Sequence, residues 1–78
     1  MLVLTGERAA KDIAVGEFVQ LPDIGGLWGE VRSTGYTDDS RDTVRMTLHV
    51  KREFAPAEHI EAIVDAWEVM WTAKEEMD

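Results

Sequence analysis

The aspartates and histidines are the residues of this chain whose types best suit metal binding. Asp38, Asp39 and Asp42 lie close together, and His49 and His59 are the only imidazoles. A calcium loop requires acids at alternate positions, a central glycine and a distal glutamate, whereas zinc sites commonly use spacings such as His-x-x-x-His. Neither pattern is present, so we expect a solvated turn at the aspartates, structural or exposed histidines, and no bound metal.

Residues for nucleophilic catalysis are equally scarce. The chain has no cysteine, and neither Ser33 nor Ser40 lies in a Gly-x-Ser-x-Gly elbow. The glycine-rich segment 23–29 matches neither a P-loop nor a dinucleotide-binding fingerprint, so we expect it to form a turn. A chain of 78 residues also has little material with which to enclose a substrate cleft. We therefore expect a non-enzymatic protein without a cofactor.

Acidic and aromatic residues are the better candidates for function. The net charge is −8, and residues 55–78 hold seven acids against the single base Lys74. Tryptophan is enriched at binding hot spots, and we expect Trp67 in the core but Trp28 and Trp71 at the surface. The candidate partner-binding residues are Trp28, Glu61, Asp65, Glu68, Trp71, Glu75 and Glu76.

A basic surface is the alternative candidate. The residues that would form it in the segment 29–52 are Arg32, Tyr36, Arg45, Lys51 and Arg52. Basic faces with interspersed aromatic rings follow the backbone of nucleic acids. The net charge of −8 opposes nonspecific attraction to phosphate, so direct nucleic-acid binding is the less favoured reading.

The strands that must position these residues are clearest in the middle of the chain. Apolar and polar residues alternate over 43–51, as expected for a half-buried strand. Turn-forming residues occupy 37–42, and 29–36 is expected to be the hairpin partner, with a bulge or sharp twist at Gly35.

Two more strands are expected upstream, one at 16–21 and one from 2–4 toward Ala10, with a loop over 21–29. The segment 15–21, Val-Gly-Glu-Phe-Val-Gln-Leu, followed by Gly-Glu-Val at 29–31, resembles the opening of SH3-like barrels. That group includes translation-factor and chromatin modules that bind RNA or protein. The resemblance implies a small half-open antiparallel barrel of about four to five strands, and no functional residue is transferred from it.

The apolar period changes after Pro56. The residues that would share one face of a helix are Ile60, Ile63, Val64, Trp67, Met70 and Trp71. Pro56 suits a first helical turn and Glu58 complements the helix dipole, so we predict an amphipathic helix. The residues at 67, 69, 71 and 73 also alternate as in a strand, and this alternative remains open.

Together these elements predict an α+β fold in a single domain, 1–78, with a β-rich barrel at 1–54 and an acidic C-terminal helix at 55–78. The absence of cysteine favours a reducing compartment, and we expect the cytoplasm. The chain shows neither a signal-peptide pattern nor an apolar run of about 20 residues that would span a membrane.

The function expected from the sequence is protein interaction. We expect the acidic helix face and the exposed tryptophans to bind a protein partner or a second copy of the chain. One alternative is an acidic mimic of nucleic acid that inhibits a DNA- or RNA-binding protein, as small phage-type inhibitors do. Another is direct nucleic-acid binding by the basic face of the 29–52 hairpin.

Overall fold

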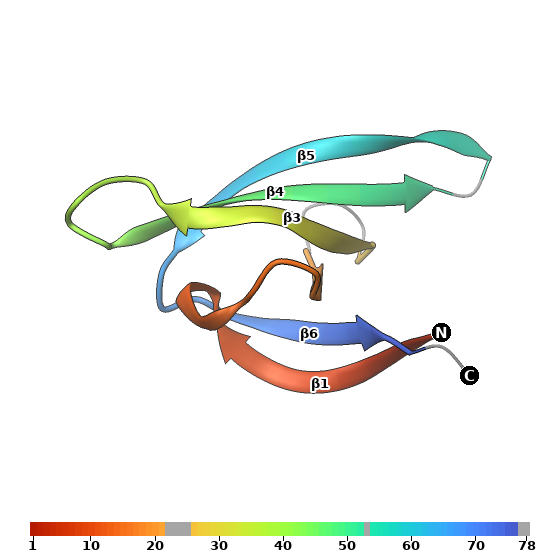
Figure 1. The fold of residues 1–78 in the computed structure, drawn as a ribbon, viewed down its shortest axis with the longest axis horizontal. Coiled ribbons are helices and arrows are strands. Elements are labelled where there is room, and N and C mark those ends of the chain that lie inside the picture. Colours follow the sequence, from red (N-terminus) through yellow and green to blue (C-terminus); the bar gives the residue numbers. More distant parts are fainter. Residues whose placement is uncertain (22–25, 53, 77–78) are drawn as a thin grey trace.

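The computed structural model of the protein describes residues 1–21, 26–52 and 54–76. The chain folds as a single antiparallel sheet. The elements are β1 (Leu2–Ala9), a short 3-10 helix η1 (Ala10–Asp12), β2 (Phe18–Gln20), β3 (Trp28–Tyr36), β4 (Thr43–Arg52), β5 (Ala55–Asp65) and β6 (Val69–Glu75). The strands are ordered β1-β6-β2-β3-β4-β5 across the sheet (Figure 1).

The predicted C-terminal helix over 55–78 is wrong, and with it the α+β fold class and the half-barrel of four to five strands. In its place β5 pairs with β4 from Thr43↔Asp65 to Arg52↔Ala55. The last strand, β6, pairs with β1 on one side and with β2 on the other. Among the described residues the structure has six strands, and its only helix is η1.

The helix prediction failed because the apolar spacing in this segment fits a strand as well as a helix. Residues at i and i+4 share a face in a helix, and they also share a face in a strand, where the period is two. Ile60 and Val64 meet both conditions, and with Ala62 between them they pack on the core from β5. The extended chain satisfies both requirements at once, because Ile60, Ala62 and Val64 face the core while the backbone of β5 pairs with β4.

The central hairpin is confirmed. The strand predicted at 43–51 is β4, and the partner predicted at 29–36 is β3, with Val31 opposite Leu48 and Tyr36 opposite Val44. The register shifts between Val31 and Ser33, so the bulge lies nearer the middle of β3 than the predicted site at Gly35.

The two upstream strands are also confirmed, with adjusted ends. The strand predicted from 2–4 toward Ala10 is β1, and the one predicted at 16–21 is the shorter β2. Of the loop predicted over 21–29, Trp28 and Gly29 belong to β3, and residues 22–25 lie outside the described residues.

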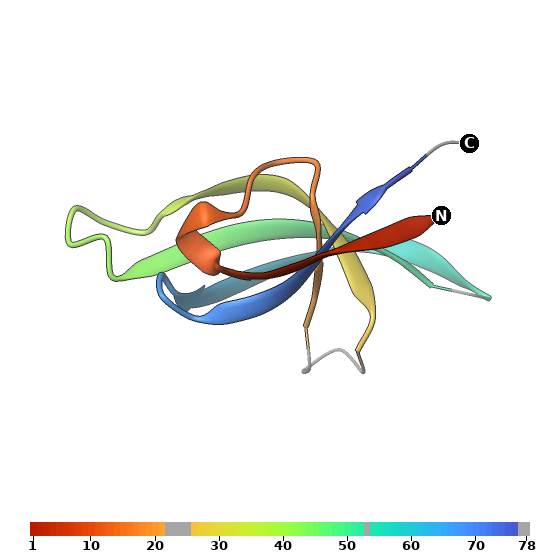
Figure 2. The same ribbon diagram turned by 90° about the horizontal axis from the view of Figure 1, so that it is seen from below.

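The sheet is bent into two layers. β3, β4 and β5 lie on one side and β1 and β6 on the other, with β2 between them (Figure 1 and Figure 2). Because β2 has only three residues and pairs with both β3 and β6, it joins the layers over a short distance.

One apolar core fills the space between these layers. Its fully or nearly buried members are Ala10, Ile13, Val19, Leu21, Val31, Val44, Met46, Leu48, Val50, Ala66 and Met70. Half of each strand's side chains point away from this core, because successive residues of a strand face opposite sides. The outward-facing side chains are therefore the ones available for binding.

No helix within the described parts of the chain has the length and apolar character required to cross a bilayer.

Candidate binding surfaces

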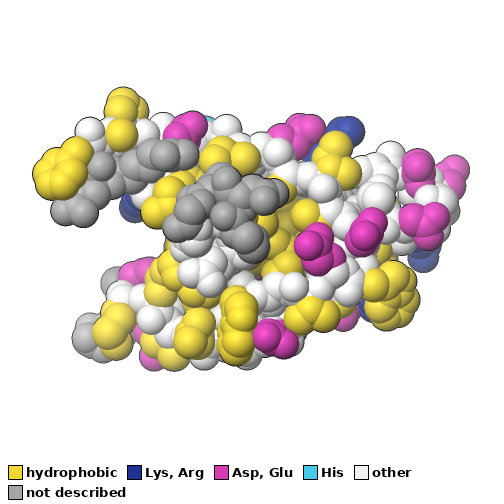
Figure 3. Space-filling view, turned by 180° about the vertical axis from the view of Figure 1, so that it is seen from behind, with side chains coloured by type: hydrophobic (Ala, Val, Ile, Leu, Met, Phe, Trp, Pro, Cys, Tyr) yellow, Lys and Arg dark blue, Asp and Glu magenta, His cyan; other side chains and the backbone are white. Residues whose placement is uncertain are grey.

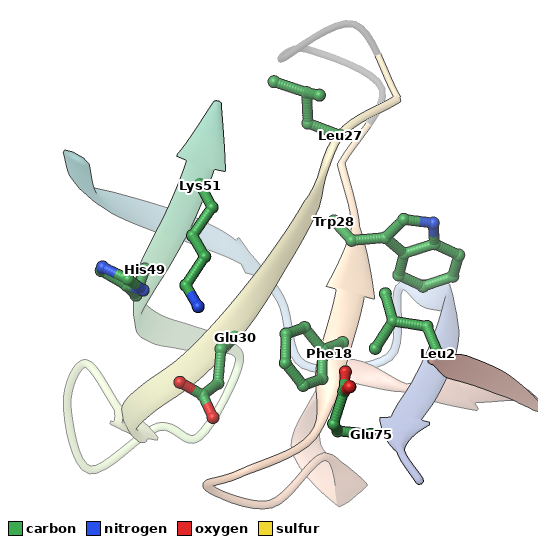
Figure 4. Close-up of a pocket in the computed structure, with 8 residues that line it drawn as sticks. All are labelled: Leu2, Phe18, Leu27, Trp28, Glu30, His49, Lys51 and Glu75. Atoms are coloured by element: carbon green, nitrogen blue, oxygen red, sulfur yellow. The ribbon is translucent and has the colours of Figure 1, made fainter. Parts of the chain in front are cut away.

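The larger of two candidate surfaces is a cleft of about 600 Å³, which we call the Trp28 cleft. It is lined by Leu2, Phe18, Leu27, Trp28, Glu30, His49, Lys51 and Glu75 (Figure 4). The register explains why these residues meet: Phe18 is opposite Glu30, and Glu30 is opposite His49. Directly opposed residues share a face, so the cleft lies on the side of the sheet that faces away from the core.

His49 and Lys51 lie on a different side of the Trp28 cleft from its aromatic side chains, and Glu75 lies beside Phe18 and Leu2 (Figure 4). Trp28, Phe18 and Leu2 lie together, whereas His49 and Lys51 come from β4 and lie across β3 from them (Figure 4). Trp28 and Phe18 are both half-buried. The cleft thus presents an aromatic wall and a polar wall.

Both acids of the Trp28 cleft have a cationic partner. An Arg32 guanidinium nitrogen lies 2.7 Å from a Glu30 carboxylate oxygen. The N-terminal ammonium of Met1 donates to a Glu75 carboxylate oxygen, also at 2.7 Å. Lys51 has no acidic partner within ion-pair distance among the described residues. Its ammonium is therefore the cleft's one uncompensated charge within that part of the chain.

The second surface is a groove of about 310 Å³ between β5 and β6, which we call the β5–β6 groove. It is lined by Gln20, Leu21, Ile63, Val64, Glu68, Val69, Met70 and Trp71. β5 and β6 are consecutive in sequence but do not pair, so the groove lies at the open side of the bent sheet. Ile63, Val69 and Trp71 are exposed by 57%, 60% and 47%.

The rear of the molecule carries apolar side chains in its middle, with acidic side chains among them (Figure 3). The same view shows a notch between the end of the β4–β5 hairpin and the end of the β1–β6 pair. This mixed surface differs from the separated acidic and apolar faces that an amphipathic helix would have given.

The predicted acidic helix face does not exist. Glu61 and Asp65 lie on β5, Glu68 lies in the turn before β6, and Glu75 and Glu76 lie at the end of β6. Three other strands separate β5 from β6 in the sheet. The five carboxylates therefore do not form one stripe: Glu68 lines the β5–β6 groove and Glu75 lines the Trp28 cleft, because extended chain spreads residues that one helix would have stacked.

Besides Glu75, which pairs with the N-terminal ammonium, two more of these candidate acids have their own basic partners. A Glu61 carboxylate oxygen lies 3.5 Å from an Arg45 guanidinium nitrogen, and a Glu76 oxygen lies 3.4 Å from the Lys74 ammonium. These local pairs lower the net field that the acids present to a basic partner.

The candidate basic residues are likewise dispersed. Arg32 and Arg45 form ion pairs with Glu30 and Glu61, and the Arg41 guanidinium lies 5.6 Å from the centre of the Tyr36 ring. Lys51 is in the Trp28 cleft, and the side chain of Arg52 lies outside the described residues. The paired arginines show little uncompensated positive charge for a phosphate backbone to follow.

The tryptophans differ from the expectation in two of three cases. Trp67, predicted in the core, is 72% exposed, and the Lys11 ammonium lies 4.4 Å from its ring centre. Trp28, predicted at the surface, is half-buried in its cleft. Trp71 is exposed, as predicted, and lines the β5–β6 groove.

The residues first considered for metal binding form local contacts. The rings of His49 and His59, opposite each other on β4 and β5, have centres 5.0 Å apart. In the hairpin turn, the hydroxyl of Ser40 donates to Asp38 at 2.5 Å, and this bond lowers the pKa of that carboxyl, assisted by the Ser40 backbone N–H. Within the described residues, no group of three or more His, Asp or Glu side chains is placed to hold a metal.

Several lining residues were not among the sequence candidates, notably Phe18, Ile63 and Val69. Phe18 alternates with Val19 in a predicted strand, so its outward direction followed once Val19 was placed in the core. Ile63 and Val69 had no such signal, because their exposure depends on β5 and β6 being strands.

Comparison of the chain with protein-family models, with curated proteins and with solved structures gives no match.

Proposed function

We propose that the chain is a small, non-enzymatic protein-interaction module of the cytoplasm, that its working surface is the β5–β6 groove, and that its partner is a second copy. The observation that carries the proposal is the exposure of Ile63, Val69 and Trp71 beside one groove. Grouped exposed apolar side chains mark interaction sites more often than isolated ones do. The absence of cysteine supports a reducing compartment.

The unpaired edge of β5 is suited to bind a partner segment in extended conformation. Within the described residues β5 pairs only with β4, so its other edge presents unpaired backbone groups along Ala55–Asp65, where Pro56 lacks an N–H. Such an edge is a template for another strand. Ile63 lies on this strand and also lines the groove, so one docked segment would cover both features.

A second copy is chemically suited to this edge. In an antiparallel pairing with Ile60 opposite Ile60, His59 of each copy would stand opposite Glu61 of the other, and no two acids would be opposed. A register is favoured when the side chains it places opposite each other carry opposite charges or form hydrogen bonds, and it is disfavoured when they carry like charges. Pairing centred on Glu61 would oppose two carboxylates, so the register is selected by charge.

The molecule has enough surface for such a contact. A standard interface buries about 800 Å² on each partner, which is roughly 15% of the 5286 Å² surface of this chain. The net charge of −8 on each copy opposes association, so apolar contact must provide the attraction. Salt screens this repulsion, and added salt is therefore expected to leave the dimer intact.

Sedimentation velocity tests the proposal. The chain is expected to sediment as a dimer at roughly tens of micromolar protein, both in low salt and in about 0.5 M salt, where surface charges are largely screened. Trp71→Glu is expected to give a monomer with unchanged far-UV circular dichroism. The matched control is Tyr36→Glu, because Tyr36 is equally exposed at 46% but lies away from the groove. A monomeric wild-type chain, or a dimer that survives Trp71→Glu, would contradict the proposal.

A further inference from the structure

We propose that the Trp28 cleft is a binding site for a small aromatic carboxylic acid. The aromatic ring would lie against Trp28 and Phe18, and the carboxylate would meet the ammonium of Lys51. This site is on another part of the surface from the β5–β6 groove and shares no lining residue with it. The inference therefore does not depend on self-association.

The size and lining of the cleft fit a small molecule. Its volume of about 600 Å³ lies within the range of ligand sites, about 300 to 1,000 Å³. Leu2, Phe18 and Trp28 form a continuous apolar wall from three different strands (Figure 4). Aromatic pairs prefer offset or edge-to-face packing, so two aromatic side chains on one wall favour an aromatic ring over an aliphatic chain.

The charge of the ligand follows from the partners already present. Glu30 is paired with Arg32, and Glu75 with the N-terminal ammonium, each at 2.7 Å. Lys51 has no such partner among the described residues. It lies two residues from His49, on the same face of β4. An anionic group would complete its pairing, and a charge-assisted bond to a carboxylate is the natural form.

A single carboxylate suits the site better than a phosphate. Lys51 is one cation, whereas phosphate recognition usually uses several cationic or backbone donors. The carboxylates of Glu30 and Glu75 also line the cleft and, although each is paired with a cation, would repel a group with two negative charges more strongly than a group with one. The expected ligand therefore has one negative charge beside an aromatic body.

Titrations followed by the indole N–H signals in ¹H–¹⁵N spectra test this inference. The probes are phenylpropionate, phenylpropylamine, phenylpropanol and cyclohexylpropionate, which separate the effects of charge and of the aromatic ring. We expect phenylpropionate to shift the Trp28 indole signal and to bind at least about fivefold more tightly than the other three, because only it satisfies both walls.

Two lysine variants provide the matched comparison. Lys51→Met is expected to weaken phenylpropionate binding about tenfold, because it removes the cation and retains most of the side chain's apolar volume. Lys74→Met removes a lysine that does not line the cleft and is expected to leave the affinity unchanged. The amide spectrum of each variant reports whether the fold is retained.

Three results would overturn the inference: equal binding of the amine and the acid, unchanged affinity in folded Lys51→Met, or a shift of the Trp71 indole in place of Trp28. A monomeric chain that still binds phenylpropionate through Lys51 would refute the proposed self-association and leave the cleft assignment standing. A dimer that fails to bind phenylpropionate would refute the cleft assignment and leave the proposed self-association standing.

Discussion

Charged residues of this protein are mostly paired with near neighbours in the sheet. Arg32 pairs with Glu30 on β3, and Arg45 on β4 pairs with Glu61 on β5. Exposed ion pairs of this kind contribute about 0–1 kcal/mol each, so their main effect is on the pattern of surface charge. Within the described side chains, Lys51 and Arg41 are the bases without an ion pair, and Lys51 is the one that lines the Trp28 cleft.

The hairpin turn offers a test at the residue scale, at Asp38. The Ser40 hydroxyl bond lowers the pKa of Asp38 below its usual 3.8, and the backbone N–H of Ser40 assists. Ser40→Ala is therefore expected to raise this pKa while leaving it below 3.8, because the backbone bond remains. An NMR titration of the side-chain carboxyl carbon measures it, with Ser33→Ala as control. An unchanged pKa in Ser40→Ala would show that the hydroxyl bond is absent in solution.

The sign of the linked stability follows from this shift. A carboxyl whose pKa is lower in the folded chain than in the unfolded chain stabilises the fold at pH values above the unfolded pKa. The contribution of Asp38 is thus fully present above pH 3.8 and is lost as the pH falls through the lowered folded value. Urea unfolding of the wild type and Ser40→Ala should accordingly differ at neutral pH and converge in strong acid.

At the scale of elements, the pairing of β3 with β4 depends on a close approach at Gly29. A Cβ placed there would lie 3.1 Å from Leu48 Cβ and 3.3 Å from Val50 Cγ2. Both neighbours are fully buried, so they have little freedom to move aside. The glycine is required here by packing, since it has an ordinary backbone conformation.

Two glycines of β3 give a matched comparison. Gly29→Ala is expected to lower the free energy of unfolding by about 1–3 kcal/mol, the usual cost of overpacking a core. Gly35→Ala places a methyl group in open space, and the free energy of unfolding should change by less than about 0.5 kcal/mol. Urea denaturation measures both. Equal effects would mean that the β3–β4 layer is less closely packed at Gly29 than the structure indicates.

The whole molecule has one core shared by every strand layer, and this makes it sensitive to single deletions. Leu48 is one of the fully buried side chains of this core. Domains of this size have small net stability, because they bury a smaller fraction of their surface than larger ones. Loss of packing at one core residue therefore affects the complete sheet.

Leu48→Ala tests this shared core. The free energy of unfolding is expected to fall by about 2–5 kcal/mol, which lowers the midpoint of thermal unfolding by at least about 8 °C in a domain this small. Val15→Ala is the control, because Val15 is 60% exposed in the turn before β2. Calorimetry or thermal circular dichroism checks both. Surface substitutions usually shift the thermal midpoint by no more than about two or three degrees. A shift that small in Leu48→Ala would contradict a single cooperative core.

The local features of the first half of the chain were determined by its sequence. Strict alternation made β4 recognisable, and turn residues marked the hairpin at 37–42. Alternation in a strand fixes which side chains point inward, so much of the core followed from these elements.

The second half was decided by tertiary structure. The apolar residues Ile60 and Val64 satisfy both the helical and the extended pattern, so local sequence is ambiguous between them. Hairpin pairing with β4, the strand directly before it, resolves the ambiguity for β5, and β6 pairs with β1 from the other end of the chain, so the backbone groups of both segments find partners in the sheet. The Trp28 cleft has the same origin: its residues come from five strands, and only the register of the sheet brings Lys51 opposite an aromatic wall.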